Sequence, residues 1–290
     1  MFLQQLVNGL ILGSIYALIA LGYTMVYGII MLINFAHGEI YMFGAFAGMI
    51  LVVFYKVPFF LAFFLAMGLA AMLGVIVEFI AYRPLRRSSR LAALISAIGA
   101  SIFLQNLALL IMGARPYSFP SPFVAKVYQT SFLSISRLEL LILCISFFLM
   151  LSLSFFIHNT KMGKAMRATA QDKDAASLMG INVNRIISIT FAVGSALGAA
   201  AGVMVGIYFR TVTPMMGLMP GLKGFVAAVL GGIGSIPGAM LGGLLLGVAE
   251  VFAAAYISSQ YRDAAAFAIL ILVLLFKPSG LWGTFTQEKV

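Results

Sequence analysis

Four ionisable side chains lie within or beside long apolar stretches, where such groups are costly and are candidates for function. Two of them, His37 and Glu39, belong to the segment Asn34-Phe35-Ala36-His37-Gly38-Glu39 between two apolar runs. A bend at Gly38 would present these polar groups to a cavity, as expected for a path or gate for a polar solute. The alternative is a helix-end cap or a buried hydrogen-bond cluster.

The other two ionisable groups are Glu78 and Glu250. Glu78 lies five residues before Arg83, and pairing with that basic segment explains it most simply. Glu250 lies deeper in an apolar run, where a place beside a path and a structural hydrogen bond are both open. Together with the glycines of a second interrupted stretch, the candidate pathway or gating residues are Asn34, His37, Gly38, Glu39, Gly232, Gly234 and Glu250.

Several kinds of chemistry have no visible site in this sequence. Gly163-Lys164 is followed by Ala165 and lacks the upstream glycine of a phosphate-binding loop, so ATP hydrolysis by that route is not expected. Two histidines, one cysteine and no paired carboxylates leave metal catalysis and acid-base catalysis without ligands or partners. We therefore expect no enzyme, no bound metal and no cofactor held by this chain.

The elements that position these residues are membrane-spanning helices. Of the 290 residues, 63% are hydrophobic and 9% are charged, against roughly 25% charged in soluble domains. Continuous apolar runs of about 20 residues fit helices that cross a bilayer, whereas barrel strands alternate. The net charge of +10 comes from basic residues in short breaks between these runs, which argues against nucleic acid. The fold class predicted is an all-α polytopic bundle.

We expect about eight spans in one domain covering 1–290, with the first span retained. Interruptions or re-entrant helices are expected near 34–39 and 231–238, since Gly231, Gly232, Gly234, Pro237 and Gly238 break the stretch 222–256. The other spans are expected near 6–26, 40–55, 59–82, 91–112, 138–157, 186–209 and 264–276. Glycines around Gly38 recur at a constant offset around Gly232, and both chance and an internal repeat about a shared path are open.

Two basic breaks set the orientation. One holds Arg83, Arg86, Arg87 and Arg90, and the other holds Lys161, Lys164, Arg167, Lys173 and Arg185. Both should face the cytoplasm, which places the N-terminus and the loop 113–137 outside. The side of the C-terminus stays open, because Lys277 and Lys289 favour the inside only if 222–256 crosses twice.

The second basic break, about 158–186, is too long for a hairpin. Residues 163–179 can form a short surface helix that Gly180 would end in the left-handed conformation. Such a helix could lie on anionic lipid headgroups or dock a cytoplasmic partner.

Three blocks of the chain resemble the branched-chain amino acid permeases of ABC importers. They are the stretch from Asn8-Gly9-Leu10 through Ile33 to Glu39, the segment Val229 to Ala239, and the closing Lys277-Pro278-Ser279-Gly280-Leu281-Trp282-Gly283. The cytoplasmic loop is similar to the coupling motif of such permeases, with Asp174 in place of the usual Glu, followed by Ala175, Ala176 and, after three residues, Gly180.

This resemblance implies a permease subunit that moves leucine, isoleucine or valine across the cytoplasmic (inner) membrane of a bacterium or archaeon. It also implies a second related permease, two cytoplasmic ATPase subunits that use ATP, and an external substrate-binding protein. Urea or short-amide importers share the N-terminal pattern and are the close alternative. The second alternative is a self-sufficient proton-coupled carrier or channel, because Glu39 and Glu250 lie in or beside the spans.

Overall fold

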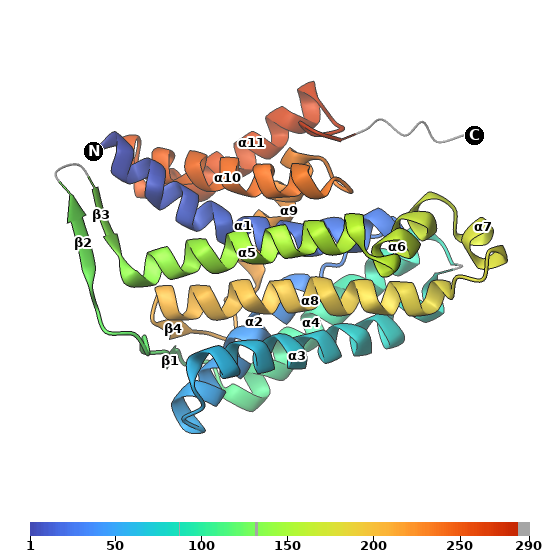
Figure 1. The fold of residues 1–290 in the computed structure, drawn as a ribbon, viewed down its shortest axis with the longest axis horizontal. Coiled ribbons are helices and arrows are strands. Elements are labelled where there is room, and N and C mark those ends of the chain that lie inside the picture. Colours follow the sequence, from blue (N-terminus) through green and yellow to red (C-terminus); the bar gives the residue numbers. More distant parts are fainter. Residues whose placement is uncertain (87, 131–132, 284–290) are drawn as a thin grey trace.

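The computed structural model describes residues 1–86, 88–130 and 133–283 (Figure 1). Its helices are α1 Phe2–Ile30, α2 His37–Met49, α3 Phe59–Val77, α4 Arg90–Met112, α5 Arg137–Asn159, α6 Lys161–Gln171, α7 Lys173–Leu178, α8 Val183–Tyr208, α9 Leu218–Gly231, α10 Ile236–Tyr256 and α11 Arg262–Phe276. Its strands are β1 Tyr117–Ser118, β2 Val127–Thr130, β3 Leu133–Ser136 and β4 Thr211–Val212. Two residues used above for orientation, Arg87 and Lys289, lie outside the described residues.

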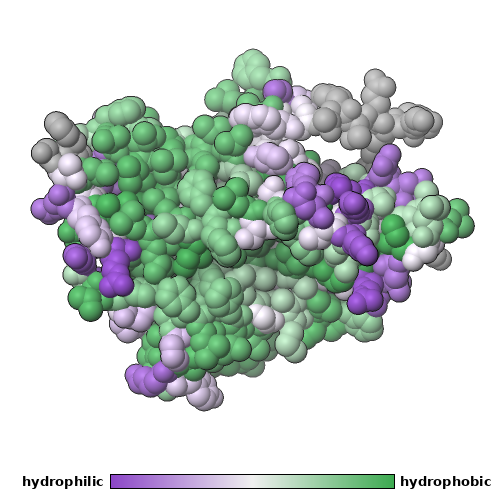
Figure 2. Space-filling view, in the orientation of Figure 1, coloured by the Kyte–Doolittle hydropathy of each residue, from purple (hydrophilic) through white to green (hydrophobic). Residues whose placement is uncertain are grey.

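Short turns of other helix types lengthen three spans, one of them α11, which the 3₁₀ turn Ser259–Tyr261 precedes. A π-helical turn continues α2 to Phe54, and π and 3₁₀ turns continue α3 to Leu85. Within the described ranges, eight helices are then long and apolar enough to cross a membrane, which confirms the predicted all-α polytopic bundle and its span count. Figure 2 shows the matching surface, with hydrophobic residues along the middle and hydrophilic residues gathered at both ends. α9, with 14 residues, is too short to cross alone.

Small residues allow the central helices to approach closely. Glycines of α1 lie against the backbone of α10. A Cβ added at Gly13 would lie 2.8 Å from Leu244 Cα. On α8, Gly202 lies against the backbone of Tyr41 in α2. The glycines that lie four residues apart from Gly194 to Gly206 therefore form a packing surface within this chain, the arrangement expected of close helix pairs in lipid. α1 and α8 form the core, whereas α4 and α11 carry mostly exposed apolar side chains.

The two ends of the bundle differ in structure (Figure 1). The antiparallel hairpin β2–β3 lies beside the N-terminus, and the Ser134 backbone N–H donates to Gln4 Oε1 at 2.8 Å. α6 and α7 lie at the opposite end. The separation of 113–137 and the N-terminus from the long basic break agrees with the predicted orientation, in which α6 and α7 face the cytoplasm.

The last described residues lie at the α6–α7 end of the bundle. The Trp282 backbone N–H donates to the Gly231 carbonyl at 3.0 Å. The turn after Gly231 reaches the end of α1, since Gly28 and Gly234 line the same cavity as Arg167 of α6. The open question of the C-terminal side is thus answered for the chain up to residue 283, which ends on the side of α6.

Two helices begin inside the bundle. His37, the first residue of α2, lies level with Gly22 of α1, where an added methyl would meet the imidazole at 2.3 Å. α1 continues for about 12 Å past that level to Ile30, so residues 31–36 carry the chain back inward before α2 starts. α9 also starts inside, because Gly217 at its start touches Gly38.

The expected interruption near 231–238 exists, but its position differs from the prediction of a shared path. Residues 232–235 form a tight turn at the end of the bundle, with Gly232 and Gly234 at positive φ. The inner end of α9 is Gly217, not Gly232. The glycines around Gly232 therefore lie at the end of the bundle and do not share an inner path with those around Gly38. Glycine clusters suit a tight turn at any depth, so the similar spacing did not fix their position.

Candidate functional site

The loop between α5 and α8 is built from two helices, where the sequence suggested one over 163–179. α6 begins at the cap Thr160, whose hydroxyl accepts from the Gly163 N–H at 3.0 Å. The helical structure is interrupted at Asp172, which follows the last residue of α6. Its carboxylate accepts hydrogen bonds from the N–H groups of Asp174 and Ala175 at 2.9 Å and so starts α7. A side chain that caps a new helix competes with continuation of the old one, which explains the break.

The four predicted coupling residues lie on and just after α7. Asp174 and Ala175 are exposed, and Ala176 is buried against the loop. Gly180 has φ +83°, and the Ile181 N–H donates back to the Ala176 carbonyl at 3.0 Å, so the glycine ends the helix as predicted. A Cβ added at Gly180 would have no atom of the described chain within 4 Å beyond its own neighbours.

Two apolar residues that the sequence analysis did not select form the tip of this loop. Leu178, the last residue of α7, is 89% exposed, and Met179, between α7 and Gly180, is 83% exposed. Side chains of this kind at the membrane-distal tip of a hydrophilic loop have no core to join within the described chain. Their position directly before a helix-ending glycine was visible in the sequence and would have drawn attention to them.

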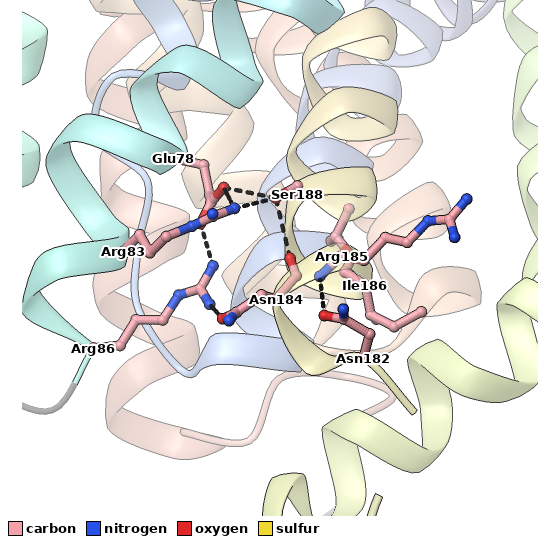
Figure 3. Close-up of polar contacts among 9 residues, drawn as sticks. Glu78, Arg83, Arg86, Asn182, Asn184, Arg185, Ile186 and Ser188 are labelled. Carbon is pink, nitrogen blue, oxygen red and sulfur yellow. Dashed lines mark hydrogen bonds and ion pairs between the residues drawn. The ribbon is translucent and has the colours of Figure 1, made fainter. Parts of the chain in front are cut away.

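An ion cluster ties the loop to the spans (Figure 3). Glu78, fully buried at the end of α3, pairs with Arg83 at 3.0 Å and with Arg86. Ser188 of α8 donates to the same carboxylate at 2.8 Å. The predicted pairing of Glu78 with Arg83 is therefore present and extends to α8, the helix that leads directly out of the loop.

In this cluster the single carboxylate of Glu78 faces two guanidinium groups, those of Arg83 and Arg86. Burial lowers the pKa of Arg86, and the Glu78 carboxylate opposes that shift. A guanidinium keeps its proton in proteins, so Arg86 stays charged. The cluster joins the end of α3 to the first turns of α8 through polar contacts, drawn as dashed lines in Figure 3.

The second region is the inner start of α2. Asn34 lies in the non-helical segment before it and accepts a hydrogen bond from the Tyr82 hydroxyl at 3.0 Å. His37 packs between Gly22 of α1 and Gly198 of α8, with its ring edge-on to Tyr23 at 4.8 Å between centroids. Both residues are buried, yet Asn34 Nδ2 and His37 Nε2 have no hydrogen-bond partner in the described structure, so both alternatives for this segment stay open.

Glu39 has different surroundings. Its side chain is 2% exposed, yet one carboxylate oxygen, Oε2, has no hydrogen-bond partner in the described structure. The other oxygen accepts a long hydrogen bond of 3.4 Å from Ser101 of α4. Glu39 and Gly38 line a cavity of about 190 Å³ between α2, α4 and the start of α9.

The remaining predicted pathway residues lie elsewhere. Gly234 lines a cavity of about 410 Å³ at the cytoplasmic end, and Gly232 packs against Gly283. Glu250 is buried in α10 and is paired with Lys223 at 2.8 Å and with Arg262. It lines none of the cavities described above, so its contacts match the structural alternative, and the structure does not bring it together with Glu39.

The family model described as "Branched-chain amino acid transport system / permease component" matches residues 5–274. The chain belongs to this permease family. High-affinity branched-chain amino acid transport system permease protein LivH of Escherichia coli (strain K12) is 49% identical over 301 residues, covering 100% of this chain and 98% of that protein. The corresponding protein BraD of Pseudomonas aeruginosa is 48% identical over the same coverage.

The permease also shares its fold with a solved structure, "PsaBC from Streptococcus pneumoniae in complex with Fab". The TM-score is 0.50 at 15% identity, covering 97% of this chain and 94% of that chain. At this identity the likeness speaks for the fold alone. The resemblance noted from sequence blocks is thus confirmed at the level of the family.

Some residues of the permease that line the Glu39 cavity were missed by the sequence analysis. Ser101 and Gln105 lie four residues apart in α4, so they share one helix face in an otherwise apolar span. That spacing was a usable signal. Lys223, a cation within an apolar stretch, was a second one, because such groups are rare in spans.

Proposed function

We propose that this permease is the membrane subunit of an ATP-driven importer of branched-chain amino acids, namely leucine, isoleucine and valine. The observation that carries the proposal is the full-length identity of nearly half to permease proteins whose names state that transport system. The chain would be a transport subunit with no catalytic site, metal or cofactor of its own, and it would reside in the cytoplasmic (inner) membrane of a bacterium or archaeon.

The partners proposed are a second related permease subunit, two cytoplasmic ATPase subunits and an external substrate-binding protein, with the lipid bilayer as solvent and no nucleic acid. The ATPase would dock on α7, and the exposed tip of Leu178 and Met179 supports this choice of surface. Methionine is enriched in protein–protein interfaces, and the fully buried centre of such a contact is more apolar than its rim.

Motion of the docked loop would reach the spans through covalent and polar links. α7 leads through Gly180 into α8, and the Glu78 cluster joins α8 to α3. Because the cluster holds several charge-assisted bonds, displacing one helix end would move the other with it. The half-length α9 and the start of α2, which touch at Gly38, would then change access to the interior from one side to the other.

A reconstituted complex tests this function. The permease, its partner permease, the ATPases and the binding protein are placed in liposomes, and uptake of leucine, isoleucine, valine and urea is measured with and without ATP. We expect ATP-dependent uptake of the three amino acids and none of urea. Gly180→Pro should abolish uptake, because proline is held at negative φ and cannot adopt the observed φ of +83°.

Two results would overturn the proposal. One is uptake by the permease alone under a proton gradient without ATP, which would establish the carrier alternative. The other is a purified complex that never contains an ATPase. Uptake of urea in place of amino acids would keep the importer and replace its cargo.

A further inference from the structure

We infer that the cavity where α2 meets α9 is a transient binding site for a zwitterionic amino acid, with the Glu39 carboxylate as the partner of its ammonium group. This inference rests on the proposed function and adds a chemical basis for handling the cargo inside the membrane. Three features of the cavity support it: the unpaired oxygen of Glu39, the uncapped start of α9 and the apolar walls.

The unpaired carboxylate oxygen is the first observation. Glu39 is buried, lines the cavity and leaves Oε2 without a hydrogen-bond partner, as noted above. A buried polar atom without a partner destabilises the fold, and more so when it is charged. In the part of the chain that the structure describes, Glu39 is the only Asp, Glu, Lys or Arg that lines this cavity. A cationic group of a solute would therefore find one defined partner here.

The start of α9 supplies the opposite polarity. α9 has neither a side-chain cap nor an acidic residue in its first turn, whereas Glu39 itself lies in the first turn of α2. Uncapped N–H groups with the helix dipole favour negative charge. Both starts meet in this place, since an added carbon at Gly217 would lie 2.5 Å from the Gly38 carbonyl oxygen and 2.9 Å from Glu39 Oε2. The start of α9 therefore favours the carboxylate group of a solute, and Glu39 favours its ammonium group.

The walls suit an aliphatic side chain. Ile98, Ile102, Leu218 and Leu222 line the same cavity, beside the polar Ser101 and Gln105. A volume of about 190 Å³ is space for a small solute and not merely one water. Mostly apolar walls with a few polar groups that fix orientation are the usual form of a small-molecule site. An amino acid with a branched aliphatic side chain satisfies every element of this lining.

The first test is Glu39→Gln in the reconstituted importer with loaded binding protein. Uptake at saturation should fall at least about tenfold, the effect of losing one charge-assisted hydrogen bond. The concentration of binding protein that gives half-maximal uptake should stay unchanged, because docking occurs outside the membrane. ATP hydrolysis should remain stimulated, and Glu39→Asp should retain part of the uptake. Glu139→Gln, the same change at the capping box of α5, is the matched control.

The second test does not depend on transport. Ser101→Cys is introduced with Cys144→Ser, which removes the single native cysteine, and the rates of modification by cationic and neutral methanethiosulfonate reagents are compared. With Glu39 present, the cationic reagent should react faster, and this preference should vanish with Glu39→Gln. Leucine supplied by the binding protein should slow the modification during turnover.

The outcomes separate this inference from the proposed function. If the wild-type importer takes up no branched-chain amino acid, the proposed function fails. If the wild type transports leucine and Glu39→Gln transports it equally well, only the site is wrong. Equal modification of Ser101→Cys by both reagents would also overturn the site, and it remains measurable even if the Glu39→Gln complex assembles poorly.

Discussion

Gly38 at the start of α2 and Gly217 at the start of α9 touch through backbone atoms alone. A carbon added at Gly38 would lie 2.5 Å from the Gly217 carbonyl oxygen, and one added at Gly217 would lie 2.5 Å from the Gly38 carbonyl oxygen. Two chain segments that enter the bundle from opposite ends thus meet with no side chain between them. The contact sets the distance between the two helix starts and, with it, the shape of the Glu39 cavity.

Gly38→Ala should therefore destabilise the permease. The added methyl meets backbone on α9, which cannot rotate away as a side chain can, and overpacking of this kind costs about 1–3 kcal/mol. The thermal unfolding temperature in detergent should drop, and uptake should drop with it.

The matched control is Gly99→Ala in α4, where an added carbon meets nothing within 4 Å. Alanine in an open helical position should leave the unfolding temperature unchanged or raise it slightly. Equal behaviour of the two variants would contradict the close contact at Gly38.

Glu78→Gln should loosen the joint between α3 and α8. The change removes the negative charge that faces Arg83 and Arg86, and both guanidinium groups are only partly exposed. We expect a loss of about 1–3 kcal/mol, below the 3–5 kcal/mol of fully buried pairs, because the arginines reach water. Uptake should fall further than ATP hydrolysis, which is the signature of weakened coupling.

Ser188→Ala provides the graded comparison for this cluster. It removes the hydrogen bond that Ser188 donates to the same carboxylate and the one that it accepts from Arg83, each 2.8 Å, and leaves both ion pairs in place. Its effect on unfolding and on the ratio of uptake to ATP hydrolysis should be smaller than that of Glu78→Gln. A larger effect would show that the hydroxyl, and not the charge pair, joins the two helices.

Much of the fold followed from the sequence, because long apolar runs leave few alternatives in lipid. The depth of the interruptions did not, because glycine and proline mark a break without fixing where in the membrane it falls. Gly232 was therefore assigned to an inner path, although it forms an end turn. In the site, Glu39 was identified from its charge. Its hydrogen-bond donor Ser101 lies 62 residues further along the chain, in another span. Local sequence patterns do not show that two such residues are close in space.

Leu178→Ser combined with Met179→Ser should weaken binding of the ATPase without unfolding the permease. Both side chains are almost fully exposed, so their loss removes no internal packing. Co-purification of the ATPase with tagged permease should decrease, while the unfolding temperature of the permease alone stays the same. Met215→Ser, an exposed methionine after β4 at the other end of the bundle, is the control and should leave co-purification intact.

Glu250→Leu should act on stability and not on the transport cycle. The carboxylate is fully buried and pairs with Lys223 and Arg262, so its removal leaves a buried ammonium with only the exposed Asp263 as partner. Breaking such a pair costs about 3–5 kcal/mol, whereas replacing both members by apolar residues is often neutral. Lys223→Met should therefore rescue Glu250→Leu in unfolding measurements. Uptake per folded complex should match the wild type in the double variant, and a persistent transport defect there would return Glu250 to the pathway.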